Sequence, residues 1–254
     1  MRDLIDRFTT DFYLLDRKTV FAFIYTAAGL TSIYYLKNPD NVAAFLRGSQ
    51  FQDLGDFIAY SPANNLPALG WWVSVVTFFY FVIPAICIRY LYGEQLSRYG
   101  LKFQVEPGFA KLLAAVLAIM LPLVYLMSST ESFAAKYPFL QIYDREPYLG
   151  MTLLIWELIY FVQFFGLEFF FRGFLVHSLK PTLGIYSIFA MTVPYTMIHF
   201  GKPPAETISA IAAGVLLGWL SYRNGNIWMG VLLHWTVAFS MDVLALYNKG
   251  LLFY

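Results

Sequence analysis

Long apolar runs separated by short polar segments make up most of the chain. A helix needs about 20 mostly apolar residues to cross a bilayer, and about seven runs approach that length. They cover residues 19–36, 67–91, 112–128, 149–176, 183–200, 205–222 and 227–247. The pattern predicts an all-α fold, a polytopic membrane helical bundle with about seven transmembrane helices and a range of about 6–8.

One stretch between the first two runs is more polar. It extends from Asn38 to Pro67 and contains Arg47, Asp53 and Asp56. We expect a loop with an amphipathic piece that lies at the membrane interface. The chain then divides into residues 1–148, with the N-terminal transmembrane helices and this interfacial loop, and residues 149–254, a helical core where the unusual residues gather.

Composition and charge agree with a membrane protein. Hydrophobic residues make up 59% of the chain and charged residues 13%, whereas soluble domains contain about 25% charged residues. The net charge of +1 gives no reason to expect a nucleic-acid partner. More Lys and Arg residues fall on the N-terminal side of the predicted bundle than on the other side, so the N-terminus is predicted to lie inside.

Ionisable side chains inside the apolar runs indicate that the helical bundle has a polar interior. Each would cost roughly 2.5–3.5 kcal/mol at the bilayer centre on insertion scales, so we expect them to face one another or a wet cavity. They are Glu157, Glu168, Arg172, His199, His234 and Asp242.

Helical spacing groups these residues. Glu168 precedes Arg172 by one turn, the spacing of an i,i+4 ion pair. Three further residues are expected to support the same site. Glu157 lies about three turns before Glu168 on the same face, Tyr195 lies one turn before a histidine, and Asp242 lies about two turns beyond another.

One carboxylate and two imidazoles on three helices admit several chemistries. Glu168, His199 and His234 are the residue types of a catalytic metal site with two histidines and one glutamate. They could also be an acid and two bases that activate water for hydrolysis. A proton relay or transport site and a purely structural polar cluster are the alternatives. The HExxH pattern of zinc peptidases is absent.

Two sequence stretches stand out, LEFFFRGFL and YTMIHFGKPPAETISAIAAGVLLGWLSYRNGNIWMGVLLH. They resemble the CPBP family of intramembrane metalloproteases, which covers the CAAX prenyl proteases and the bacteriocin-processing (ABI family) enzymes. The resemblance runs from about residue 149 to 245, and it implies that residues 149–254 form a catalytic helical core.

The family's motifs can be aligned residue by residue. Its EExxxR motif reads here from Leu167 through Glu168 to Arg172, so leucine replaces the first glutamate. Its FxxxH motif reads from Tyr195 to His199. Its last motif, a histidine followed four residues later by Asn or Asp, reads from His234 to Ala238, so alanine replaces the polar partner.

The resemblance implies an intramembrane endopeptidase, a hydrolase that cuts a peptide bond in a membrane protein or in a lipidated or CAAX-like tail. Glu168 would activate water, Arg172 would orient Glu168, and His199 and His234 would complete the site. Glu168 and the two histidines could hold a divalent metal such as zinc, or the site could work without a cofactor.

The resemblance also suggests a bacterial cytoplasmic (inner) membrane, with the lipid bilayer as a further partner. Because Leu167 and Ala238 replace polar residues of the family, a second reading is a non-cleaving relative that binds a partner or acts as a membrane scaffold. A transporter is the third.

Overall fold

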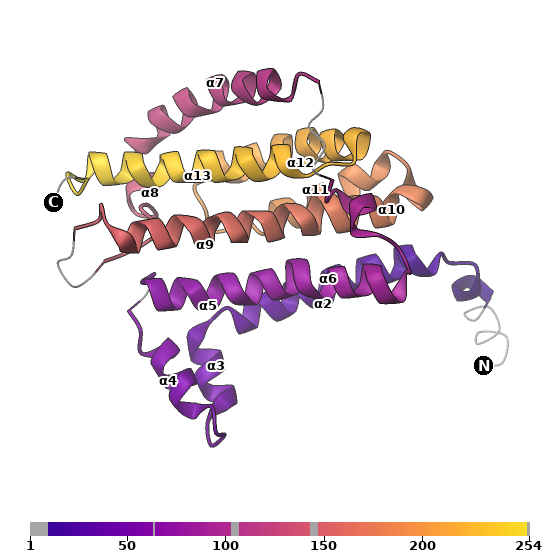
Figure 1. Ribbon diagram of the computed structural model, residues 1–254, viewed down its shortest axis with the longest axis horizontal. Helices are drawn as coiled ribbons and strands as arrows, with labels where there is room; N and C mark the ends of the chain where they lie inside the picture. Colours follow the sequence, from indigo (N-terminus) through magenta and orange to yellow (C-terminus); the bar gives the residue numbers. More distant parts are fainter. Residues whose placement is uncertain (1–9, 63, 103–106, 143–146, 253–254) are drawn as a thin grey trace.

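The computed structural model describes residues 10–62, 64–102, 107–142 and 147–252, and the regular elements in these ranges are all helical (Figure 1). Among them, 6 helical stretches are long and apolar enough to cross a membrane. The predicted polytopic helical bundle is therefore confirmed. The stretches are α2 (Arg17–Leu36), α5 to η2 (Leu66–Leu91), α7 (Phe109–Ser128), α9 to α10 (Met151–Leu183), α12 (Pro204–Asn224) and α13 (Trp228–Asn248).

One predicted span is shorter than expected. In place of a helix over residues 183–200, the chain forms α11 (Tyr186–Met197), which has 12 residues and is about 18 Å long. The helix ends shortly after Pro194, and a turn containing Gly201 and Pro203 leads into α12. This turn places the end of α11 next to the start of α12.

Two of the long stretches contain π-helical segments, which are rare and occur often at functional sites. The second stretch is composed of α5 (Leu66–Thr77), η1 (Phe78–Val82), α6 (Ile83–Ile86) and η2 (Cys87–Leu91). The fourth is composed of α9 (Met151–Glu168), η4 (Phe169–Leu175) and α10 (Val176–Leu183). The segment η4 contains Arg172, so the helix is irregular where the sequence places its buried charge.

The long helices lie side by side, and α9 packs against both α5 and α13 (Figure 1). Helix α7 covers the other side of α13. The four phenylalanines of η4 are 0–1% exposed and belong to the main hydrophobic core. They are Phe169, Phe170, Phe171 and Phe174.

The polar stretch after α2 forms two short helices, α3 (Pro39–Leu46) and α4 (Gln52–Ala59), which pack against each other and project from one end of the bundle (Figure 1). Gly55 allows this contact, because a Cβ there would lie 3.2 Å from the Cα of Ala43. Their outer faces carry exposed aromatic side chains, including Phe45 and Phe57. An amphipathic helical piece was expected here, and its place at the membrane interface stays a prediction.

Helices α11 and α12 approach closely through small residues. A Cβ at Gly214 would lie 2.8 Å from Cγ2 of Thr192 and 3.2 Å from the ring of Tyr195, and a Cβ at Gly218 would lie 2.8 Å from Cε of Met191. The small-residue spacing in the sequence predicts this packing. The contact holds Tyr195 against α12, which matters for the site described below.

We expect Gly214→Ala to destabilise the protein by about 1–3 kcal/mol, because the added methyl overpacks the contact between α11 and α12. Gly70→Ala is the matched control, since a Cβ at Gly70 meets nothing within 4 Å and alanine favours a helix over glycine. Thermal unfolding in detergent measures both. Equal unfolding temperatures for the two variants would contradict close packing at Gly214.

Candidate functional site

A buried ion pair lies where α9 passes into η4. Arg172 Nη1 donates a hydrogen bond of 2.8 Å to Glu168 Oε1, and the two side chains are 1% and 0% exposed. The guanidinium carbon of Arg172 lies 3.8 Å from the centre of the Tyr195 ring. The predicted i,i+4 pair is thus confirmed. The opposite charges and the ring contact offset the cost of removing both ions from water.

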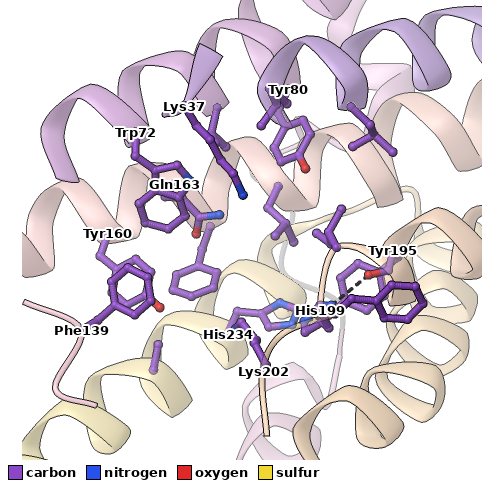
Figure 2. Close-up of a pocket in the computed structure, with 18 of the residues that line it drawn as sticks. Lys37, Trp72, Tyr80, Phe139, Tyr160, Gln163, Tyr195, His199, Lys202 and His234 are labelled. Atoms are coloured by element: carbon purple, nitrogen blue, oxygen red, sulfur yellow. Dashed lines mark hydrogen bonds between the residues drawn. The ribbon is translucent and has the colours of Figure 1, made fainter. Parts of the chain in front are cut away.

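His234 of α13 lies between Glu168 and Tyr195. Its Nδ1 is 2.8 Å from Glu168 Oε1, although the N–H is not aligned well enough for a hydrogen bond, so the contact is electrostatic. Its Nε2 is 2.9 Å from the Tyr195 hydroxyl (dashed line in Figure 2). The carboxylate favours the proton on Nδ1, which leaves Nε2 to accept from the hydroxyl.

His199 follows α11 and shares the neighbourhood of Tyr195. Its Nδ1 donates a 2.9 Å hydrogen bond to the backbone carbonyl of Tyr195, so Nε2 carries the lone pair. Burial and the nearby charge of Lys202 lower the pKa of His199 to about 4, so the ring is neutral at pH 7. Within the described part of the chain, Nε2 has no hydrogen-bond partner and is free to accept one.

Both imidazoles line a cavity of about 660 Å³ (Figure 2). This volume is typical of small-molecule sites, which range over about 300–1,000 Å³. Residues of α2, α5, α9, α11 and α13 form its walls, and most of them are apolar or aromatic. Its polar lining residues are Thr31, Lys37, Gln163, Tyr195, His199, Lys202, Glu206 and His234, and five further tyrosines line it as well, Tyr34, Tyr35, Tyr80, Tyr137 and Tyr160.

Glu168 does not line this cavity. It is fully buried behind His234, and its Oε2 lies so close to Gly230 that a Cβ there would collide with it. The neighbouring Leu167 does line the cavity, and so does Ala238. At both positions where the family motifs have a polar residue, the cavity wall is therefore apolar. The remaining motif carboxylate, Glu168, is buried behind this wall.

The two acids expected to support the site lie elsewhere. Asp242 is 1% exposed and accepts hydrogen bonds from the Phe139 N–H (2.7 Å) and from Trp156 Nε1 (2.9 Å). It therefore anchors the segment after α8 (Glu131–Ala134) to α9 and α13. Glu157 is 5% exposed, and both of its carboxylate oxygens lack a hydrogen-bond partner among the described residues. Neither acid lines the cavity.

One acid at the opening of the cavity was not singled out as a site residue in the sequence. Glu206, in the first turn of α12, is 2.6 Å from Lys202 Nζ and accepts a 3.0 Å hydrogen bond from the Tyr137 hydroxyl. The i,i+4 spacing of Lys202 and Glu206 could have indicated their ion pair. No sequence signal links Tyr137 to Glu206, because they are far apart in the chain.

The residues present do not fit a metal ion held by Glu168, His199 and His234. Both ring nitrogens of His234 already face partners, and the oxygens of Glu168 face Arg172, His234 and Gly230. Within the described ranges, no group of three or more His, Cys, Asp or Glu side chains is placed to hold a metal. The divalent metal stays a prediction that this arrangement does not favour.

We expect Asp242→Ala to lower stability by about 2–5 kcal/mol, because two buried donors, Phe139 N–H and Trp156 Nε1, lose their charged acceptor. Asp53→Ala on α4, an exposed acid, is the control and should change stability by less than about 0.5 kcal/mol. Thermal unfolding in detergent compares them. An unchanged midpoint for Asp242→Ala would refute the anchoring role.

Comparison with known proteins supports the family expected from the motifs. Residues 149–240 match the family model described as type II CAAX prenyl endopeptidase, Rce1-like. The recognition of the CPBP family is thus confirmed over this segment, which contains Glu168, Arg172, His199 and His234. No curated protein and no solved structure gives a significant match.

Proposed function

We propose that this integral membrane protein of the CPBP family is an intramembrane endopeptidase. Its substrate would be a membrane protein or a lipidated, CAAX-like peptide tail in the bacterial cytoplasmic membrane, with the N-terminus of the enzyme inside. The observation that carries the proposal is His234, which lies between a buried carboxylate and a tyrosine hydroxyl at the wall of a cavity that also presents His199.

His234, rather than Glu168, is the general base in this proposal. Glu168 is sealed from the cavity, so a water there cannot reach it, whereas His234 lines the cavity and is 18% exposed. Glu168 places its carboxylate 2.8 Å from His234 Nδ1, and Arg172 holds that carboxylate through a 2.8 Å hydrogen bond. Glu168 and Arg172 are therefore positioning residues that act through the imidazole.

The hydrolytic step follows from these contacts. A water that displaces the Tyr195 hydroxyl from His234 Nε2 gives that nitrogen a proton, and the resulting hydroxide attacks the carbonyl carbon of the peptide bond. The freed hydroxyl of Tyr195 can donate a hydrogen bond to the oxyanion. His234 then passes its proton to the leaving amine as the C–N bond breaks, which yields a carboxylic acid and an amine.

A specific observation favours a second function, in which the protein binds a membrane partner without cleaving it. Leu167 and Ala238 both line the cavity, and both replace polar residues of the family motifs. A cavity without these groups could hold a peptide or an apolar tail without cutting it.

A cleavage assay on purified protein with a panel of membrane peptides tests the proposal. We expect His234→Ala to reduce kcat/KM by about 100-fold or more, because it removes the general base. Glu168→Gln should lower kcat by about 10–100-fold with little change in KM, since it acts through His234. Glu131→Gln, an exposed acid on α8, is the matched control for the carboxylate-to-amide change.

Restoring the family glutamate with Leu167→Glu separates the two functions. If the natural chain cleaves no peptide of the panel and Leu167→Glu begins to cleave, the natural protein is the non-cleaving relative and our first proposal fails. If the natural chain cleaves and His234→Ala abolishes the cleavage, the second proposal fails. Thermal unfolding of each variant shows that the comparison is made on folded protein.

Removal of bound metal by a chelator tests whether cleavage needs a divalent metal ion. Because no three His, Cys, Asp or Glu side chains of the described residues are placed to hold a metal, we expect dialysis against a strong chelator to change the cleavage rate by less than about twofold. Metal analysis of the dialysed protein is the control that removal was complete. Loss of cleavage that zinc restores would show that Glu168, His199 and His234 rearrange around a metal.

A further inference from the structure

Two lysines from separate segments line the cavity, and a third, Lys136, lies near one of them, Lys37. Lys37 directly follows α2, Lys136 follows α8, and Lys202 lies in the turn before α12. Lys37 and Lys202 line the cavity, and Figure 2 shows Lys37 extending into it. Lys37 follows one long apolar helix, α2, and Lys202 precedes another, α12. We infer that ammonium groups at these helix ends lie where a bilayer changes from hydrocarbon to polar head groups.

Two of these charges have no acidic partner among the described residues. Lys202 is paired with Glu206 at 2.6 Å. Lys37 and Lys136 make only ring contacts, with Nζ 5.8 Å from the centre of Tyr34 and 5.9 Å from the centre of Phe139. Partial burial lowers the pKa of Lys37, and repulsion from Lys136 lowers it further. An anion bound between them would relieve this repulsion.

The wall beneath the lysines is apolar and reaches the outer surface of the bundle. Leu30 and Ile33 of α2 line it, and so do the half-exposed or exposed side chains of Tyr34, Met197 and Phe200, which are 66%, 54% and 66% exposed. The cavity is therefore open on the side that faces lipid. A molecule with an anionic head and an apolar chain matches this combination.

We propose that the cavity is a binding site for an anionic lipid, whose head group binds Lys37 and Lys136 and whose acyl chain lies along the apolar wall. The placement of the cations at head-group level favours a lipid over a soluble anion. This site does not depend on peptide cleavage, although the lipid would occupy the same cavity as a substrate.

Fluorescence quenching by brominated lipids tests the proposal, because Trp72 lines the cavity. The purified protein in neutral detergent is titrated with phosphatidylglycerol or phosphatidylcholine that carry the same brominated chains. The quenching that disappears in Trp72→Phe reports occupancy of the cavity. We expect half-maximal quenching at a concentration at least about fivefold lower for the anionic lipid.

The lysine variants localise the head group. Lys37→Gln and Lys136→Gln should each weaken binding of phosphatidylglycerol by about fivefold and leave phosphatidylcholine unchanged. Lys249→Gln is the matched control, because Lys249 follows α13, is exposed and does not line the cavity. Counting bound lipids by native mass spectrometry repeats the comparison without the tryptophan substitution, in case Trp72→Phe does not fold.

Several outcomes would overturn the proposal. Equal quenching by the two lipids, or an anionic preference that both lysine variants retain, would show that the lysines do not bind the head group. Displacement of the lipid by glycerol phosphate at a similar concentration would show that the chain contributes nothing. Tighter displacement by an apolar peptide with a free carboxyl terminus than by its amide would assign the lysines to a peptide end. A cleavage defect changes none of these readouts.

Discussion

The site depends on one interaction, the buried ion pair between Glu168 and Arg172. Both side chains are almost completely removed from solvent, so each charge is tolerable only with its partner in place. His234 lies against the carboxylate, and the Tyr195 ring lies against the guanidinium. Because these partners come from α11 and α13, the ion pair specifies how three helices meet, and removing either charge would leave the other uncompensated inside the bundle.

The same constraint decides which groups can do chemistry. The carboxylate that pairs with Arg172 does not line the cavity, and the absence of a side chain at Gly230 leaves room for Glu168 in that enclosed position. The adjacent position on the helix, about 100° away, is the one that faces the cavity, and it is occupied by Leu167. Of the motif residues, Tyr195, His199 and His234 therefore line the cavity, whereas the Glu168 carboxylate lies behind His234.

Local patterns in the sequence predicted the features that depend on local geometry. Apolar run lengths predicted most of the spans, and i,i+4 spacing predicted the Glu168 pair. The small residues of α12 indicate a close helix contact, but they do not identify α11 as the partner. The direction in which each helix faces the cavity depends on packing against distant segments, so the enclosure of Glu168 and the anchoring by Asp242 could not be read from spacing. The π-helical turns of η4 also change the angular register after residue 168, so ideal helical angles do not apply there.

Peptide cleavage and lipid binding would compete for one cavity, and this competition has a physical consequence. An acyl chain in the cavity excludes the water that hydrolysis needs, so the resting protein would be protected from unproductive chemistry. A substrate must therefore bind more tightly than the lipid. It would do so through an apolar segment that contacts the wall and a polar group that contacts the lysines or the imidazoles. Differential binding of this kind distinguishes a true substrate from the surrounding bilayer, because every lipid shares the apolar chain and only the polar contacts differ.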